Sequence, residues 1–200
     1  MRVGVLADIH ADFDALERAL EFFQSRGVDE IICAGDLVDK GFDGDDVVAL
    51  IQERGIPTVQ GNHDHTPSSS RSLSDDTREF ISTLPDELRF RRDNRQVYMT
   101  HATPWSQWQY LLPQSTPTVF RHVAKAARAD VVVVGHTHIP MLAVVGSHTL
   151  IVNPGSASAD CSYGDDGATC GILTLDGRIQ FDVYALDIWQ PVQPEKVVVS

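Results

Sequence analysis

The chain has 200 residues, of which 28 are acidic, 16 are basic and eight are histidines, and its formal net charge is −12. This length suits one domain over residues 1–200, and an apolar content of 42% is enough for one sizeable core. The negative charge argues against an extended nucleic-acid surface, because no basic region is concentrated enough to displace counterions. A small anionic substrate would need a local reversal of the field, which a bound metal ion supplies.

The start of the chain is apolar for only a few residues before Asp8, which is too short for the core of a signal peptide. No run approaches the ~18 apolar residues that a membrane-spanning helix needs. We therefore expect a cytoplasmic protein without a membrane partner. The sequence leaves the oligomeric state open, and a homo-oligomer is one alternative.

The first half of the chain alternates strands and helices. Apolar runs predict strands at 3–7 and 30–35, a further strand is expected at 57–61, and helical periodicity predicts helices over 12–26 and 45–54. This βαβαβ order predicts a parallel sheet with right-handed crossovers. In such sheets the functional site lies beyond the carboxyl ends of the strands.

The second half changes from helices to short strands. The predicted elements are a polar loop over 66–76, a helix over 75–84, a hairpin over 88–100 that turns at Asp93-Asn94, a helix over 117–128, and strands at 131–134, 141–145, 149–152, 171–175 and 179–184. The whole pattern predicts an α/β fold whose last third is rich in strands.

Most of the histidines lie in short motifs that directly follow predicted strands. These motifs are Asp8-Ile9-His10, Gly35-Asp36, Gly61-Asn62-His63-Asp64, Thr100-His101-Ala102 and Gly135-His136-Thr137-His138. Because the carboxyl ends of parallel strands share one edge of a sheet, we expect these residues to converge. The glycines before Asp36, Asn62 and His136 permit unusual backbone angles and close approach at the strand ends.

The converging side chains form a set of candidate metal ligands: Asp8, His10, Asp36, Asn62, His101, His136 and His138. Imidazole together with carboxylate suits manganese, iron, cobalt, nickel or zinc, and the absence of thiolates argues against a structural zinc site. Seven ligands are too many for one tetrahedral ion, but they suit two ions that share one carboxylate. Two such ions ~3.5–4 Å apart are a standard arrangement for phosphoester hydrolysis.

The motifs together resemble those of the calcineurin-like metallophosphoesterases. The matching blocks are DIH at 8–10, GDLVDKG at 35–41, GNHD at 61–64, His101, and GHTH at 135–138. They are most similar to the small bacterial and archaeal phosphodiesterase branch, as is Asn153-Pro154-Gly155-Ser156, although the arginine that often follows that segment is missing here. The resemblance implies a fold of two mixed β-sheets packed as a sandwich and flanked by helices.

The resemblance also implies a role for each residue. One metal ion would be held by Asp8, His10, Asp36 and His138, and the other by Asp36, Asn62, His101 and His136, with Asp36 bridging. His63 would be the general acid, Asp39 would orient it, and Lys40 would contact the phosphate together with Asn62. Related phosphatases carry arginine at the position of Lys40, and lysine offers a point charge without arginine's bidentate fork.

The implied activity is hydrolysis of a small phosphodiester, a nucleotide included, by attack of a metal-bridging hydroxide with His63 as acid. Manganese is the first choice of ion, with iron, nickel, zinc, cobalt or magnesium as alternatives. The alternative functions are a phosphomonoesterase, a dinucleoside-polyphosphate hydrolase and a non-catalytic metal-binding scaffold. The presence of His63 argues against the scaffold.

The segment 104–110 (PWSQWQY) is rich in aromatic residues and follows the candidate ligand His101. One hypothesis is that Trp105 and Trp108, with Tyr110, form a wall over the metals that stacks on a nucleobase or an aryl leaving group. The other is that they form a hydrophobic anchor or a dimer contact.

Overall fold

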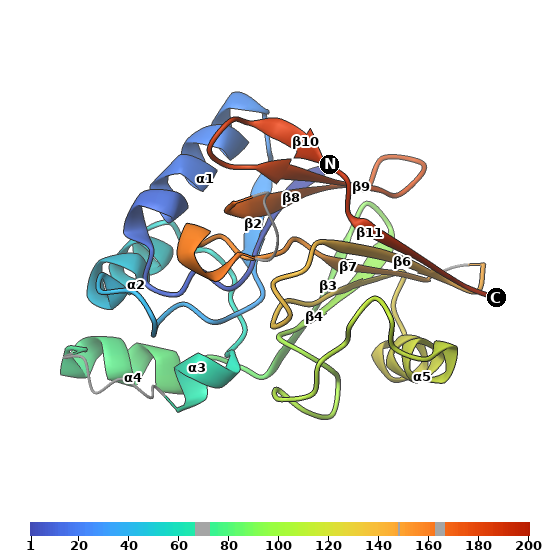
Figure 1. Cartoon of the computed structure of the whole chain (residues 1–200), viewed down its shortest axis with the longest axis horizontal. Coiled ribbons are helices and arrows are strands. Elements are labelled where there is room, and N and C mark those ends of the chain that lie inside the picture. Colours follow the sequence, from blue (N-terminus) through green and yellow to red (C-terminus); the bar gives the residue numbers. More distant parts are fainter. Residues whose placement is uncertain (67–72, 148, 163–166) are drawn as a thin grey trace.

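The computed structural model describes residues 1–66, 73–147, 149–162 and 167–200, so most of the predicted loop over 66–76 lies outside the described residues. The described chain forms two mixed β-sheets packed face to face, with helices on the outer faces (Figure 1). This arrangement confirms the predicted α/β sandwich. It also places the loops that follow several strands at one rim of the two sheets.

One sheet has five strands in the order β10-β9-β8-β1-β2. Its strands are β1 (Arg2–Leu6), β2 (Glu30–Cys33), β8 (Thr169–Thr174), β9 (Gln180–Ala185) and β10 (Gln190–Val192). β1 pairs with β2 in parallel, as the alternating first half predicts, and with β8 antiparallel. β1 therefore has a strand on either side and is buried on both faces, which explains its almost continuous apolar sequence.

The other sheet has six strands in the order β11-β6-β7-β5-β4-β3. Its strands are β3 (Glu87–Arg92), β4 (Arg95–Thr100), β5 (Val131–Val133), β6 (Met141–Val145), β7 (Thr149–Asn153) and β11 (Glu195–Val199). β3 and β4 form the predicted hairpin, whose turn residues Asp93 and Asn94 have φ angles of 44° and 63°. Two left-handed residues in succession are typical of tight hairpin turns.

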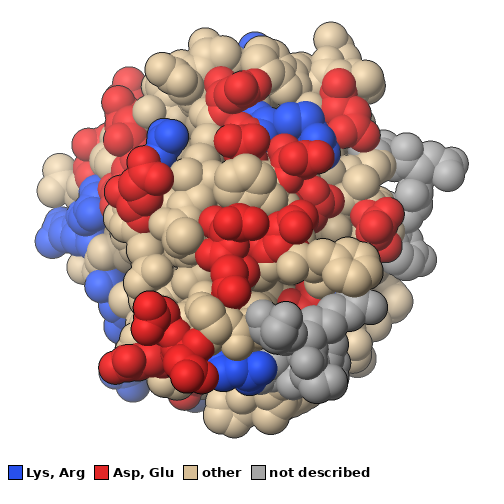
Figure 2. Space-filling model, turned by 90° about the vertical axis from the view of Figure 1, so that its left-hand side faces the viewer, with Lys and Arg blue, Asp and Glu red and all other residues tan. Residues whose placement is uncertain are grey.

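The helices cover both outer faces of the sandwich. They are α1 (Phe13–Ser25), α2 (Gly44–Glu53), α3 (Asn62–His65), α4 (Asp75–Thr83), α5 (Pro117–Ala127) and a 3₁₀ turn η1 (Ala159–Cys161). α1 begins at Asp12, whose side chain accepts a hydrogen bond from the Ala15 N–H at 3.0 Å. Acidic side chains dominate the centre of the face that α1, α2 and α4 present (Figure 2).

Three apolar clusters hold these layers together. Between the sheets, Val3 and Val5 of β1 pack in the same cluster as Met99 and Val133 of the six-stranded sheet. On the outer faces, α1 and α2 pack against the five-stranded sheet, and α5 packs against the six-stranded sheet through Phe120. Side chains of β1 alternate between the two faces of the sheet, so they pack both in the cluster between the sheets and in the cluster under α1 and α2.

Two parts of the sequence-based prediction differ from the structure. The strand predicted at 57–61 is wrong: the segment makes one isolated bridge, Cys33 with Thr58, and then turns into α3. Pro57 has no N–H to donate, and the N–H of Gly61 is used by Asp64, so a longer ladder cannot form here. The strands β10 and β11 were not predicted, because they contain or adjoin prolines and pair with strands distant in sequence.

Candidate metal centre

The seven predicted ligands all lie in loops or turns that follow strands of the sandwich. Asp8 and His10 follow β1, Asp36 follows β2, Asn62 opens α3, His101 follows β4, and His136 and His138 follow β5. The structure brings them together as two neighbouring groups of side chains.

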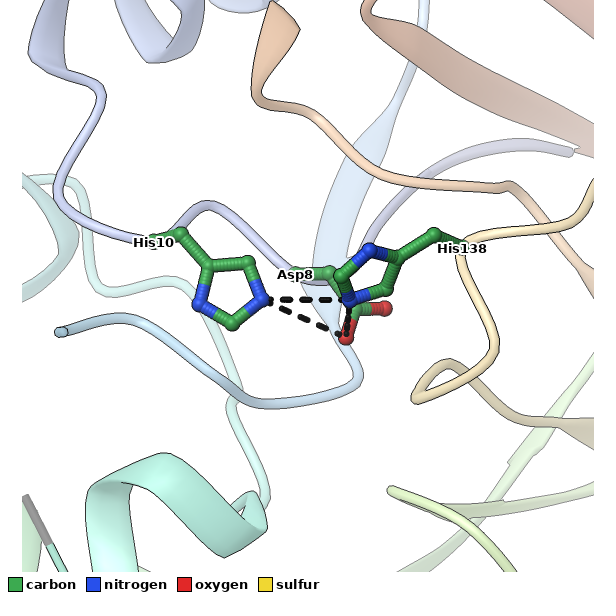
Figure 3. Close-up of side chains that lie close together, drawn as sticks. All are labelled: Asp8, His10 and His138. Atoms are coloured by element: carbon green, nitrogen blue, oxygen red, sulfur yellow. Dashed lines mark hydrogen bonds and ion pairs between the residues drawn. The ribbon is translucent and has the colours of Figure 1, made fainter. Parts of the chain in front are cut away.

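We call Asp8, His10 and His138 the first ligand group (Figure 3). His138 Nε2 lies 3.2 Å from Asp8 Oδ1 and 3.2 Å from His10 Nε2, and His10 Nε2 lies 3.9 Å from Asp8 Oδ1. Asp8 and His10 are buried, while the His138 side chain is 16% exposed. The three ligand atoms therefore converge on one point that solvent reaches from the His138 side.

The second ligand group consists of Asp36, His101, His136 and Asn62. His101 Nε2 lies 3.3 Å from Asp36 Oδ2 and 3.0 Å from Asn62 Oδ1, and the rings of His101 and His136 have centroids 5.1 Å apart. The same Asp36 Oδ2 is also 3.8 Å from His10 Nε2 of the first group. One carboxylate oxygen thus lies between the two groups, as a shared ligand requires.

These separations fit metal ions. Nitrogen and oxygen ligands ~2.1 Å from one ion, at tetrahedral or octahedral angles, lie ~3.0–3.4 Å from each other. Several of the measured distances fall within or close to this range. In addition, His136 Nε2 is buried and has no hydrogen-bond partner among the described residues, which is unusual for a polar atom unless it binds something else.

The outer nitrogens of two ligands show which ring atom is available to a metal. His101 Nδ1 donates to the Ala34 carbonyl at 2.7 Å, and His138 Nδ1 donates to the Cys161 carbonyl. In the neutral imidazole this leaves a lone pair on each Nε2, which points at the oxygens of Asp36 or Asp8. A lone pair repels a carboxylate oxygen, so a proton or a metal ion between the two atoms stabilises this arrangement.

The electrostatics of the histidines agree with a cation site. Burial lowers the pKa of His10 to about 4, and burial together with the neighbouring His101 lowers the pKa of His136 to about 4. Burial also opposes charge on His101, yet the carboxylate of Asp36 raises the pKa of this imidazole to about 9. His10 and His136 are therefore neutral at pH 7, which is the form that binds metal, and the field of the carboxylates favours a positive charge at the second group.

Five of the seven predicted ligands have left-handed backbone. The φ angles are 55° at Asp8, 51° at His10, 57° at Asp36, 67° at His136 and 60° at His138. This conformation costs a non-glycine residue about 1–2 kcal/mol. Strain of this kind gathers where side-chain placement matters for function.

The glycines of the motifs mostly serve close packing. Gly35 does adopt a positive φ of 91°, as expected. At Gly61, however, an added Cβ would lie 2.1 Å from Asp36 Oδ1, and at Gly135 it would lie 2.6 Å from Asp8 Oδ2. These two glycines therefore give the ligand carboxylates the space that they occupy.

Asp64, for which the sequence motifs predicted no role, organises the loop that carries Asp36. Its carboxylate accepts hydrogen bonds from four main-chain N–H groups, those of Asp36, Leu37, Val38 and Gly61, at 2.8–3.2 Å. Burial and the charge of Asp36 raise its pKa to about 6. The available signal was its position as the last residue of the GNHD block.

His63, Asp39 and Lys40 lie beside the first ligand group. His63 Nδ1 is 2.6 Å from Asp39 Oδ2, and the rings of His63 and His10 have centroids 5.0 Å apart. The His63 side chain is 26% exposed, whereas Asp39 is buried. Lys40 Nζ lies 3.1 Å from His10 Nε2. The structure therefore places all three predicted residues close to the first group.

The aromatic residues of segment 104–110 lie in different places. The Trp105 ring stacks on His122 of α5, with centroids 4.4 Å apart, and its Nε1 donates to Gln109 Oε1 at 2.6 Å. The Tyr110 ring stacks on the candidate ligand His136, with centroids 4.3 Å apart. Trp108 is more than half exposed.

The segment at 153–156 donates hydrogen bonds to the main chain of two loops that carry predicted ligands. Asn153 Nδ2 donates to the Gly135 carbonyl at 2.7 Å, and Ser156 Oγ donates to the Asp8 carbonyl at 2.8 Å. Both side chains are fully buried. Two side chains from the strand-rich last third of the chain thus fix the main chain of the motifs that contain Asp8 and Gly135.

Comparison with known proteins identifies the family. Residues 1–178 match the calcineurin-like phosphoesterase superfamily domain, and the chain belongs to this superfamily. The phosphodiesterase MJ0936 of Methanocaldococcus jannaschii is 27% identical over 189 residues, which cover 89% of this chain and 95% of that protein. Protein MJ0912 of the same archaeon is 28% identical over 160 residues, which cover 70% of this chain but 63% of that protein, less than two thirds of its length.

The fold is also similar to a solved structure. A metallophosphoesterase from Sphaerobacter thermophilus superposes with a TM-score of 0.71 at 24% sequence identity, covering 97% of this chain and 89% of that chain. This likeness confirms the metallophosphoesterase fold. Within the described part of the chain, no helix is long and apolar enough to cross a membrane.

Proposed function

We propose that this chain is a two-metal phosphodiesterase whose ions are held by the two ligand groups, with Asp36 shared between them. The observation that carries the proposal is the position of Asp36 Oδ2, 3.3 Å from His101 Nε2 and 3.8 Å from His10 Nε2. A single carboxylate oxygen within reach of both groups is what a pair of ions ~3.5–4 Å apart requires.

The metal ions, when bound, lower the pKa of water and offset negative charge on the phosphoryl oxygens. His63 acts as the general acid. Asp39 accepts the Nδ1–H of His63, which orients the ring and leaves Nε2 to carry a proton to the leaving oxygen. The partial exposure of the His63 side chain lets its ring contact a substrate that enters from solvent.

Lys40 and Asn62 contact the phosphoryl group in this proposal. The Lys40 ammonium already lies 3.1 Å from a ligand nitrogen of the first group, so it can donate to a phosphoryl oxygen at that group. Asn62 Oδ1 lies beside His101 in the second group. A lysine contributes a point charge here, so we expect it to affect substrate affinity more than orientation.

The likeness to an archaeal phosphodiesterase over most of both chains favours diesters over monoesters as substrates. We propose a small phosphodiester, nucleotides included, as the substrate class, and manganese as the first ion to test. The ligands themselves do not distinguish manganese from iron, nickel, zinc, cobalt or magnesium.

Two generic esters test the proposal. Freshly purified protein is loaded with Mn²⁺, its metal content is measured, and its rates on bis-p-nitrophenyl phosphate and p-nitrophenyl phosphate are compared. We expect faster hydrolysis of the diester. Faster hydrolysis of the monoester would replace the proposal by a phosphomonoesterase, and no turnover of either ester by protein that contains two ions would support the scaffold.

A further inference from the structure

The segment 104–110 runs between two ligands of the second group, His101 and His136. It begins just after the ligand His101, and at its end the ring of Tyr110 lies flat on the ligand His136. The two ring centroids are 4.3 Å apart and the planes differ by 23°. Such a parallel contact restricts rotation of the imidazole about its side-chain bonds.

Tyr110 is fixed in place on both sides along the chain. On one side, Trp105 is anchored on α5 by its stack on His122. On the other side, Leu111 is 1% exposed and packs in the same apolar cluster as Phe120 of α5. Tyr110 is nevertheless 58% exposed as a residue. It therefore projects from an anchored loop, with one face on His136.

His136 depends on this loop more than the other ligands do. The outer nitrogens of His101 and His138 bond to carbonyls outside this segment, those of Ala34 and of Cys161 in η1. The imidazole of His136 instead lies next to the main chain of Trp108, within segment 104–110. The same loop therefore meets this imidazole at two places, the main chain of Trp108 and the ring of Tyr110.

We propose that Tyr110 is a positioning residue for His136, and that its stack sets the affinity of the second ligand group for its ion. The inference rests on the proposed two-metal function. His136 Nε2 has no hydrogen-bond partner among the described residues, so no hydrogen bond there fixes the nitrogen that would bind the metal. Partners that orient a metal-binding histidine typically change metal affinity by about 10–100-fold.

Trp108 supplies a matched control. It lies in the same loop and is 55% exposed, and the part of it next to His136 is its main chain. Trp108→Ala keeps that main-chain contact, whereas Tyr110→Ala removes the stack. Tyr110→Phe keeps the aromatic face, and Tyr110→Leu keeps apolar bulk without it.

The test is calorimetric titration of metal-free protein with Mn²⁺, together with thermal unfolding of each variant. We expect two equivalents in the wild type. In Tyr110→Ala and Tyr110→Leu one equivalent should bind about tenfold or more weakly, with the other unchanged. Tyr110→Phe and Trp108→Ala should match the wild type, and the unfolding temperatures should stay close together.

Two results would overturn the inference while leaving the proposed function intact. One is wild-type affinity for both equivalents in Tyr110→Ala and Tyr110→Leu. The other is an equal loss in Trp108→Ala, which would assign the effect to loop packing instead of the stack. A wild-type protein that binds fewer than two equivalents would contradict the proposed function itself, and the inference with it.

Discussion

The two ligand groups share one carboxylate but have different surroundings. Beside the first group lie an imidazole, a carboxylate and an ammonium, from His63, Asp39 and Lys40. Beside the second group lie the amide of Asn62 and the ring of Tyr110. In the proposed function, these surroundings assign proton transfer to the side of the first group and ligand positioning to the side of the second.

The shared Asp36 should give the largest effect. In the wild type the main-chain N–H of His63 donates to Asp36 Oδ1 at 2.9 Å. Asp36→Asn keeps an oxygen that can accept this hydrogen bond but removes the negative charge that both ligand groups use. We expect kcat/KM on bis-p-nitrophenyl phosphate to fall by about 10³-fold. Asp46→Asn, an exposed acid in the first turn of α2, is the control and should be unaffected. Retention of activity within about tenfold would show that the groups do not work as a pair.

His63 should give the next effect, and its size should depend on the leaving group. A general acid contributes about 10²–10⁴-fold, and p-nitrophenolate leaves without needing a proton. In His63→Ala we expect kcat to fall at least about 100-fold on a dinucleotide and clearly less on bis-p-nitrophenyl phosphate. His65→Ala is the control, because His65 bonds to Gln60. Equal losses on the two substrates would falsify the acid role.

Asp39 should affect kcat by orienting His63. Asp39→Asn removes the carboxylate that lies 2.6 Å from His63 Nδ1, and we expect kcat on the dinucleotide to fall about tenfold. Combined with His63→Ala it should cause no further loss, because the two residues act as one unit. Additive losses in the double variant would instead place Asp39 in a separate role.

Lys40 should give the smallest effect. Lys40→Gln removes an exposed charge beside His10, so we expect KM to rise about fivefold with little change in kcat, and the rise to shrink at high salt. Lys125→Gln on α5 is the control for a general loss of positive charge. A fall in kcat with unchanged KM would show that Lys40 acts in the transition state.

Much of the candidate site could be predicted from the sequence, because its residues follow directly after strands that the sequence itself predicts. Each of the motifs with Asp8, Asp36, His101 and His136 directly follows a short apolar strand, and the ends of such strands meet at one rim. The resemblance of the motifs to one family then assigned a role to each residue. The fold class followed from the same pattern.

Other features depend on contacts that sequence patterns do not show. The segment 57–61 stands where the alternating pattern predicts a strand but makes one bridge, and β11 pairs with a strand more than fifty residues earlier. The left-handed φ of Asp8 is imposed by its surroundings and has no signal in a single sequence. Likewise the sequence singled out segment 104–110 but not which aromatic ring, that of Tyr110, reaches a ligand.

The central claim is that the two ligand groups bind two ions through one shared carboxylate. The most direct measurement is the number of divalent ions per chain, by elemental analysis of freshly purified protein, in the wild type and in Asp36→Asn. The account predicts two ions in the wild type and a loss in the variant. One ion or none in the wild type after exposure to Mn²⁺, or two ions retained by Asp36→Asn, would contradict it.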